Sequence, residues 1–335
     1  MAVKRLVKPK KPAKDHKSLN RSLPKKPDEQ PKNQDKFGRL KPVLTAIFGV
    51  IVIIFILFSA GLYTFKWISP VVEGITAVIP YPVALVNSRP IYFHSWEKSV
   101  LALQQYYQLA KVNNPALVSP SLSENGSSVL GRLIDQELLN QEVIKYNVKV
   151  TADEIDNYVD SLARNFNDDQ ELESQLKNFY GWNLVDFKNE IVQPLLLRNQ
   201  LAVALLDEPI NQTAKARAEN ILAQVNEAKI SFADLAKMYS EDASGQQGGD
   251  LGYISRGQLV PEIDDAIFSL APGQISNLVK SPLGFHILKV TAQLTDNQGN
   301  ITQVKVQQIL VRGQAINDYL NDLKTKSKIV RLIKI

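Results

Sequence analysis

The feature that most constrains this chain is a stretch of 23 residues, 43–65, that carries no charged side chain. A helix needs about 20 predominantly apolar residues to cross the hydrocarbon core of a bilayer. Core helices are rarely apolar on every face over this length, and the apolar region of a cleaved signal peptide runs only about 7–15 residues. The sequence therefore predicts a transmembrane helix over residues 43–66, with a buried core helix and a signal peptide as the alternatives.

Charge is distributed unequally on the two sides of this stretch. The formal net charge is +5, but residues 1–41 hold fourteen Lys and Arg against four acidic residues, so the rest of the chain is acidic overall. Basic residues beside a span mark its cytoplasmic side. We therefore expect a single pass through the plasma membrane, with the N-terminus in the cytoplasm and the later domains outside.

Residues 1–42 form a tail rich in Lys and Pro, and this composition predicts disorder, because it cannot bury enough apolar surface to offset the entropy of ordering. Nucleic-acid binding is one role for such a basic run. Attraction to anionic headgroups is the plainer interpretation, since the tail lacks the repeated aromatic residues that stack on bases. We expect the lipid bilayer as a partner and no nucleic acid.

The region after the span begins with residues 67–82, whose three prolines predict a short extended linker. Residues 83–91 then predict a strand, a turn and a second extended piece, and a helix follows. After a polar loop over 113–128, apolar residues at helical spacing predict a helix over 129–144.

A capping box, Thr151-Ala152-Asp153-Glu154, predicts the start of another helix. Two more helices are expected over 169–179 and 184–206. Residues 83–210 are therefore predicted to form a mostly helical domain.

Four blocks of sequence in the second half of the chain carry a family resemblance. Residues 239–253 read YSEDASGQQGGDLGY and residues 281–288 read SPLGFHIL, with GQLVPEI (257–263) and FSLAPGQIS (268–276) between them. In order and spacing these blocks resemble the parvulin-type peptidyl-prolyl cis-trans isomerases. The resemblance covers residues 213–292 and implies an α+β domain with a four-stranded antiparallel sheet and surrounding helices.

The helical domain resembles the N-terminal domain of SurA-, PrsA- and PpiD-type foldases, through Val83-Ala84-Leu85-Val86-Asn87 and the pattern over residues 129–155. In those proteins the domain forms a partly apolar cradle for unfolded chains. The plainer alternative is that it only holds the isomerase away from the membrane. The resemblance also implies that residues 313–335, a helix and a strand, return to this domain.

Parvulin domains open with a strand of the form "v.arHILv", and no such strand precedes Ala214. Residues 304–311, VKVQQILV, match it, with Gln308 in place of the His. A short loop could join the last strand to this one as an antiparallel hairpin. We therefore predict an isomerase domain over residues 211–312 that is circularly permuted, with its first strand at 304–311. The alternative is a truncated domain followed by an unrelated strand.

The resemblance implies the residues of a site. Leu259 stands where Met is usual and Ile263 where Phe is common, which predicts a shallow pocket. Rotation about a prolyl bond needs no covalent step, so neither a metal ion nor another cofactor is expected. The implied catalytic residues are His286, Asp242 and Gln308, and the implied substrate-binding residues are Leu259, Ile263 and Phe268.

The sequence thus predicts a membrane-anchored peptidyl-prolyl isomerase that assists the folding of exported proteins. Its expected partners are unfolded or partly folded polypeptides that contain X-Pro bonds. Because Gln308 and the small pocket residues depart from the parvulin pattern, two alternatives stay open. One is a catalytically weak or inactive parvulin-domain chaperone, and the other is a structural adaptor in a membrane complex.

Overall fold

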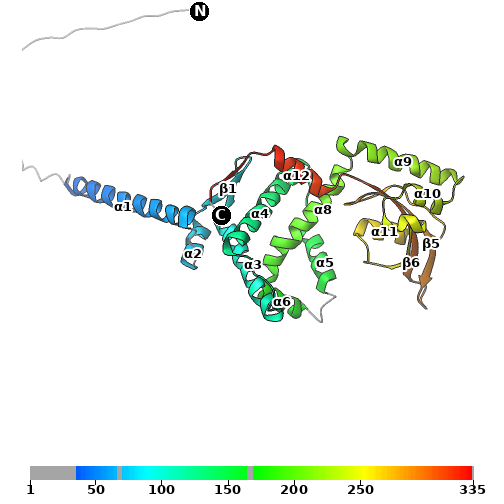
Figure 1. Cartoon of the computed structure of the whole chain (residues 1–335), viewed down its shortest axis with the longest axis horizontal. Helices are drawn as coiled ribbons and strands as arrows, with labels where there is room; N and C mark the ends of the chain where they lie inside the picture. The colour runs from blue at the N-terminus through cyan, green and yellow to red at the C-terminus, as the bar shows by residue number, and fades with distance from the viewer. Residues whose placement is uncertain (1–34, 66–69, 164–168, 334–335) are drawn as a thin grey trace, which may run out of the picture. The chain divides into compact units, whose positions relative to one another are not determined.

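The computed structural model describes residues 35–65, 70–163 and 169–333 (Figure 1). Its contacts divide the chain into two compact units, residues 1–58 and 59–335. Most of the predicted disordered tail, residues 1–34, lies outside the described residues.

Helix α1 spans Asp35–Phe65. Residues 35–42, which were predicted to belong to the disordered tail, are therefore helical, because extending a nucleated helix by further turns costs little. Within α1, the segment Phe48–Phe65 is long and apolar enough to cross a membrane, by length and composition.

The predicted extended linker is wrong for most of its length, because residues Pro70–Val78 form helix α2. Proline is well tolerated in the first turn of a helix, where its missing N–H would have no intrahelical partner and its fixed φ is already helical. Pro80 and Pro82 follow the end of α2, where they interrupt no helix.

The N-terminal domain combines a small sheet with helices. Strand β1 (Pro82–Val86) and strand β2 (Arg89–Tyr92) correspond to the predicted strand and extended piece, and they pair antiparallel. The helices that follow are α3 (Phe93–Asn113), α4 (Leu122–Lys145), α5 (Ala152–Ala163), α6 (Asp169–Tyr180), α7 (Leu184–Phe187) and α8 (Gln193–Leu205).

Helix α4 begins inside the segment that was predicted to be a polar loop. The Ser121 hydroxyl accepts a hydrogen bond from the Glu124 backbone N–H at 3.2 Å, and the Glu124 carboxylate accepts one from the Ser121 N–H at 2.7 Å. This capping box satisfies two N–H groups at the helix start and overrides the polar composition of the first turns. The predicted box of Thr151 and Glu154 is present before α5.

The long helix predicted over residues 184–206 is interrupted by a π-helical turn, η1 (Lys188–Val192). The Gln193 N–H reaches back to the Lys188 carbonyl, one residue further than in an α-helix. Pro194 follows, has no N–H to donate, and its ring would clash with the carbonyl of Glu190 in a regular helix. The wider turn accommodates the proline without ending the helical path.

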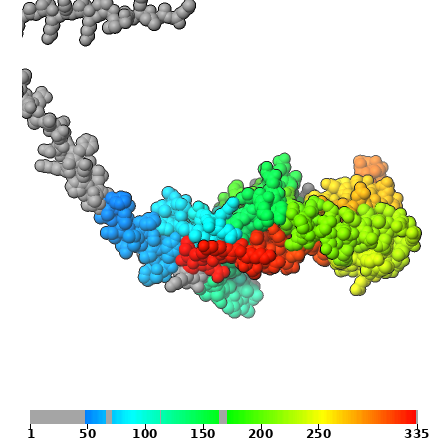
Figure 2. Space-filling model, turned by 90° about the horizontal axis from the view of Figure 1, so that it is seen from above, coloured from blue at the N-terminus to red at the C-terminus, as the bar shows by residue number. Residues whose placement is uncertain are grey.

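The C-terminal segment returns to the N-terminal domain, as predicted. Strand β7 (Ile329–Arg331) pairs antiparallel with β1, giving the order β2-β1-β7. Helix α12 (Ile316–Lys326) buries Leu320 in a cluster with Leu139 of α4 and Leu201 of α8. Figure 2 shows these red C-terminal residues alongside the cyan and green residues of the N-terminal domain. Within the predicted returning segment 313–335, the strand covers only Ile329–Arg331, and residues 334–335 lie outside the described part of the chain.

The second domain is built on a four-stranded antiparallel sheet of order β3-β6-β5-β4, which confirms the predicted α+β fold. Its strands are β3 (Asp250–Ser255), β4 (Val279–Ser281), β5 (Gly284–Thr295) and β6 (Ile301–Arg312). Its helices are α9 (Gln212–Glu227), α10 (Phe232–Tyr239), the short 3₁₀ turn η3 (Ala243–Gln247) and α11 (Pro261–Ser269).

Strand β6 occupies a central position between β3 and β5. It pairs with β5 along almost its whole length, from Gly284 opposite Arg312 to Thr295 opposite Ile301. The connecting turn is held by Asp296, whose side chain accepts hydrogen bonds from the N–H groups of Gln298 and Asn300. Residues 304–311 therefore form the antiparallel neighbour of β5 that the sequence predicts.

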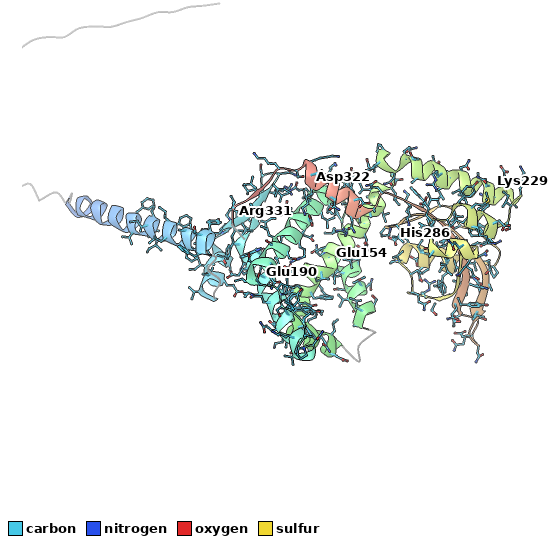
Figure 3. The ribbon with its side chains drawn as sticks, in the orientation of Figure 1. Glu154, Glu190, Lys229, His286, Asp322 and Arg331 are labelled. Atoms are coloured by element: carbon cyan, nitrogen blue, oxygen red, sulfur yellow. The ribbon has the colours of Figure 1, made fainter. Side chains whose placement is uncertain are left out.

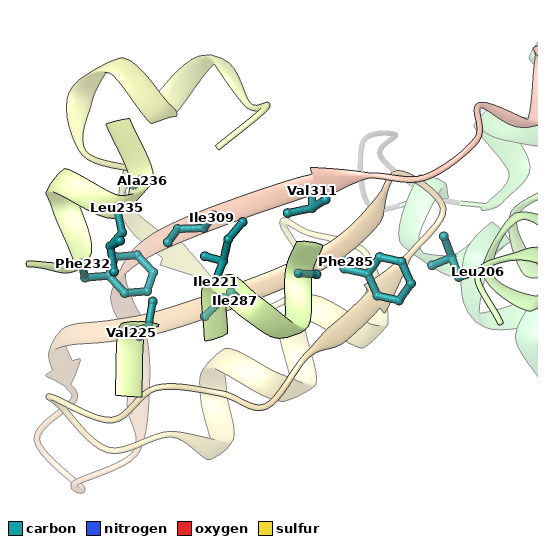
Figure 4. Close-up of a cluster of buried hydrophobic side chains, with 11 residues drawn as sticks. Leu206, Ile221, Val225, Phe232, Leu235, Ala236, Phe285, Ile287, Ile309 and Val311 are labelled. Carbon is teal, nitrogen blue, oxygen red and sulfur yellow. The ribbon is translucent and has the colours of Figure 1, made fainter. Parts of the chain in front are cut away.

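Both faces of the β5–β6 pair are covered, and the strand period of two decides which residues point to which face. On one face lie Phe285, Ile287, Ile309 and Val311, packed with residues of α9 and α10 such as Leu235 (Figure 4). The opposite face carries the buried residues Leu288, Val290, Val304 and Val306, which pack with α11.

The loop after η3 approaches β6 very closely at Gly249. The Gln308 N–H donates a 2.8 Å hydrogen bond to the Gly249 carbonyl, and Gly249 has a φ of +79°. A Cβ atom at Gly249 would lie 2.2 Å from the Gln308 carbonyl oxygen. The glycine is therefore needed for space as well as for its backbone conformation.

We expect Gly249→Ala to destabilise this second domain by at least about 2 kcal/mol more than Gly257→Ala. Gly257 has a similar φ of +82° but open space around its missing Cβ, so its substitution costs only the left-handed conformation, about 1–2 kcal/mol. Urea unfolding of both variants measures the difference. Equal losses of stability would show that the loop does not depend on its close approach to β6.

Candidate active site

A row of hydrogen-bonded side chains crosses three neighbouring strands on one face of the sheet. His286 of β5 is buried, with 4% of its surface exposed. Its Nδ1 lies 3.2 Å from Oε1 of Gln308 on β6, and its Nε2 lies 2.7 Å from the hydroxyl of Ser281 at the end of β4. Figure 3 shows His286 within the second domain. The three side chains meet because β4, β5 and β6 are adjacent strands.

Asp242 extends this row from the loop that leads into η3. Its carboxylate accepts hydrogen bonds from the N–H and the hydroxyl of Ser244, so Asp242 is the N-cap of the 3₁₀ turn. The side chain of Gln308 lies beside this carboxylate and lowers the pKa of Asp242. Gln308 thus links Asp242 to His286, and we refer to Asp242, Gln308, His286 and Ser281 as the site network.

The site network has one consistent arrangement of protons. The carbonyl oxygen Oε1 of Gln308 faces Nδ1 of His286 and, because it can only accept, Nδ1 carries the proton. The amide nitrogen of Gln308 is then left to face Asp242, whose pKa Gln308 lowers. Nε2 of the neutral imidazole is then an acceptor, and the Ser281 hydroxyl donates to it. The Ser281 oxygen in turn accepts from the Leu283 N–H at 3.1 Å. Each of these hydrogen bonds has one donor and one acceptor when the imidazole is neutral.

The local electrostatics favour this neutral state. Burial lowers the pKa of His286, and this effect outweighs the hydrogen bond with Gln308 and the charge of Asp242, which raise it. For Asp242, burial alone would raise the pKa. The contacts with Ser244 and Gln308 together lower the pKa by more than burial raises it, so it lies below its ordinary value. At neutral pH the network therefore contains a neutral imidazole and an ionised carboxylate.

The three predicted pocket residues belong to one apolar cluster on the face of the sheet that also carries His286. Ile263 and Phe268 project from α11 and are 4% and 8% exposed, whereas Leu259 is only partly buried. The Arg256 guanidinium lies 4.4 Å from the centre of the Phe268 ring. The structure thus brings the pocket candidates together, and their role in binding a proline ring stays a prediction.

Ser281 is the one member of the site network that the sequence did not single out. It lies within the block SPLGFHIL, five residues before His286. Ser281 pairs with Gly284 where β4 turns into β5, which places its hydroxyl beside the imidazole. The only sequence signal for Ser281 is that it is a polar residue at the start of this block. Its contact with His286 depends on the geometry of the β4–β5 hairpin.

Comparison with known proteins assigns both domains. Residues 203–292 match the PPIC-type PPIase domain, and residues 36–201 match the SurA-like N-terminal domain. The chain is 30% identical to foldase protein PrsA of Geobacillus sp., covering 61% of this chain and 77% of the relative. It is 34% identical to foldase protein PrsA 2 of Bacillus anthracis, covering 47% and 59% respectively. It is 37% identical to chaperone SurA of Chromobacterium violaceum, covering 39% and 30%.

The chain therefore belongs to the PrsA/SurA foldase family and contains a PPIC-type PPIase domain. It spans 59% of the length of the Bacillus anthracis relative. The match to the PPIase domain ends at residue 292, so β6, which begins at Ile301, lies beyond it.

The free energy of unfolding should fall as the pH drops below about 6.5, the ordinary pKa of histidine. His286 has a lowered pKa in the folded state, so the unfolded chain binds more protons in this range. The contribution of His286 is fully present above the unfolded pKa and is lost as the pH falls toward the folded pKa. Asp242 contributes in the same direction, but only near and below pH 4.

Urea unfolding of residues 59–335 between pH 7.5 and 5 measures this effect. We expect His286→Gln, which removes the imidazole, to flatten the pH dependence of stability in this range. Identical slopes for the wild type and the variant would mean that His286 has the same pKa in the folded and unfolded states.

Proposed function

We propose that the isomerase domain accelerates cis-trans isomerisation of X-Pro bonds. The observation that carries this proposal is the site network, which lies on the same face of the sheet as the apolar cluster of Leu259, Ile263 and Phe268. Rotation about a peptide bond meets a barrier of about 18–20 kcal/mol, and an X-Pro bond takes tens to hundreds of seconds to isomerise unaided.

The barrier arises from amide resonance, which gives the carbonyl oxygen of the planar bond a partial negative charge. An apolar surface that holds the proline ring leaves the bond free to rotate while supplying few donors that would stabilise the planar form. The ionised Asp242 carboxylate adds a negative charge to the site, which disfavours the charge-separated planar form of a nearby amide. A site of this kind binds the twisted bond better than the planar bond, and this difference lowers the barrier.

Gln308 takes the place of a histidine in the parvulin pattern. Its amide supplies one donor and one acceptor at the same time, which lets it connect Asp242 with His286 without carrying a charge. A histidine at this position could exchange its donor and acceptor roles and adjust to the rotating bond, whereas an amide keeps one orientation. We therefore propose an active isomerase that is slower than parvulins with two histidines.

Gln308→His should raise kcat/KM for a proline peptide in a protease-coupled assay, whereas His286→Ala should lower it about tenfold or more. The His286→Ala change leaves buried partners without hydrogen bonds, which costs about 1–3 kcal/mol. Each 1.36 kcal/mol added to the activation free energy lowers the rate about tenfold. Gln307→His is the matched control, because Gln307 neighbours Gln308 on β6 but bonds to the Gly248 carbonyl instead.

If Gln308→His leaves kcat/KM unchanged or lowers it, Gln308 does not hold the position of the parvulin histidine. If the wild type gives no acceleration at all, the chaperone without isomerase activity is the better account. The buried state of Ile263 and Phe268 is the observation that favours that second candidate, because it leaves little of either side chain for a substrate. Suppression of client aggregation by residues 68–335 would then support it, and failure to suppress would favour the structural adaptor.

We further propose that the isomerase domain is circularly permuted relative to the parvulin pattern. The support is the sequence 304–311, which resembles the missing first strand, together with its pairing beside β5. Circular permutation is tolerated where the original termini lie close together at the surface.

We also propose that α1 anchors the protein in the plasma membrane and that the later domains assist the folding of exported polypeptides outside the cytoplasm. The support for the anchor is the apolar segment Phe48–Phe65 with the basic residues before it. The relatives are named foldases and chaperones. The N-terminal domain also exposes large apolar side chains, with Val112 76% and Val118 85% exposed, as expected of a surface that binds unfolded chains.

Protease added to intact spheroplasts should digest residues 68–335 and leave the basic tail protected. The positive-inside rule gives the reason, since the tail carries the excess of Lys and Arg. Antibodies against an epitope at each end of the chain measure which part survives, and detergent-permeabilised cells are the control. Protection of the C-terminal epitope in intact spheroplasts would contradict the proposed topology.

A further inference from the structure

Helix α2 has two distinct faces. Val72 and Thr76 are 4% and 3% exposed and face the protein, where the Thr76 hydroxyl lies 3.4 Å from the carboxylate of Glu97 on α3. Val71 and Val78, seven residues apart and therefore on one side of the helix, are 71% and 82% exposed. Gly74 lies between them and is also exposed. We call Val71, Gly74 and Val78 the outer face of α2.

The sequence around the outer face is unusual for a surface exposed to water. Between Lys66 and Arg89 the only charged residue is Glu73. Surface helices of soluble domains carry charged or polar residues on the side that faces solvent. An apolar outer face in an almost uncharged segment therefore indicates an environment other than bulk water.

The position of α2 along the chain indicates which environment that is. About 20 helical residues span the hydrocarbon core, so a span that starts near residue 43 reaches the headgroup boundary close to Tyr63. Tyr is favoured at that level. The Tyr63 hydroxyl donates a 2.9 Å hydrogen bond to the Pro82 carbonyl, and its ring lies 6.4 Å from the ring of Tyr81.

Both ends of α2 are therefore held near the last turns of α1. Its C-terminal end leads within a few residues to Tyr81 and Pro82, which contact Tyr63. Its N-terminal end at Pro70 follows Phe65 by five residues, which can span at most about 18 Å. A helix tied in this way to the end of a span remains at the level of the headgroups.

We propose that α2 is an interfacial helix that lies in the plane of the bilayer surface, with its outer face inserted at the boundary between headgroups and acyl chains. This inference rests on the proposed membrane span of α1 and adds a second lipid contact to it. The buried face of α2 packs on α3, so insertion of the outer face orients the N-terminal domain toward the membrane surface. Insertion of such helices reaches about 5–10 Å.

The absence of cysteine from the chain allows a direct test by single-site labelling. Val71→Cys and Val78→Cys are each spin-labelled in the full chain, which is reconstituted in vesicles of phosphatidylethanolamine and phosphatidylglycerol. Collision rates with oxygen, which concentrates in the bilayer, and with a water-soluble nickel chelate are measured. Ile53→Cys, 58% exposed within α1, is the control for the span, and Val118→Cys, 85% exposed in the N-terminal domain, is the control for water.

We expect the ratio of oxygen to nickel collisions at Val71 and Val78 to be several-fold higher than at Val118 and lower than at Ile53. If Ile53 is bilayer-like while both α2 labels match Val118, α2 lies in water and the inference is overturned, although the span stands. If both α2 labels are shielded from oxygen and nickel alike, a second copy or another protein covers the outer face, and the inference is again overturned. If the collision ratio at Ile53 matches that at Val118, α1 does not span the membrane, and the inference that rests on this span is overturned with it.

Discussion

The antiparallel pairing of β5 with β6 is the interaction on which the rest of the isomerase domain depends. The two 12-residue strands form the centre of the sheet, and their opposite faces carry the two apolar clusters that hold α9, α10 and α11 in place. The same pairing brings Gln308 beside His286 and positions the Gln308 backbone against Gly249. A single ladder of backbone hydrogen bonds thus supports the core, the loop with Asp242 and the site network.

The pairing also has a consequence for the order of the chain. Strand β6 comes after β5, and the segment that follows it returns to the N-terminal domain through α12 and β7. The last residues therefore complete a sheet whose first strand, β1, lies more than two hundred residues earlier. The isomerase domain is inserted between two parts of the N-terminal domain, so it is connected to that domain by two chain crossings rather than one.

Much of this arrangement could be predicted from the sequence where the signal is a family motif or a local pattern. The resemblance of residues 304–311 to the first strand of the parvulin pattern predicted the β5–β6 hairpin, and the Thr151 capping box predicted the start of α5. The predictions are wrong where one local signal fits two structures. Pro70 lies in the first turn of α2, which tolerates proline, and Ser121 and Glu124 form a capping box within a run whose polar composition predicts a loop. Ser281 could not be assigned, because its contact with His286 depends on a hairpin that brings side chains of two strands together.

A double-mutant cycle on kcat/KM tests whether Gln308 and His286 act as one unit in the site. Gln308→Ala, His286→Ala and the double variant are compared in the protease-coupled assay, with folding of each verified by circular dichroism. If the two side chains act through their hydrogen bond, the double variant should be about as slow as His286→Ala, with a coupling energy of about 0.5–3 kcal/mol. Fully additive losses in the double variant would contradict the account, because they would mean that Gln308 and His286 contribute independently.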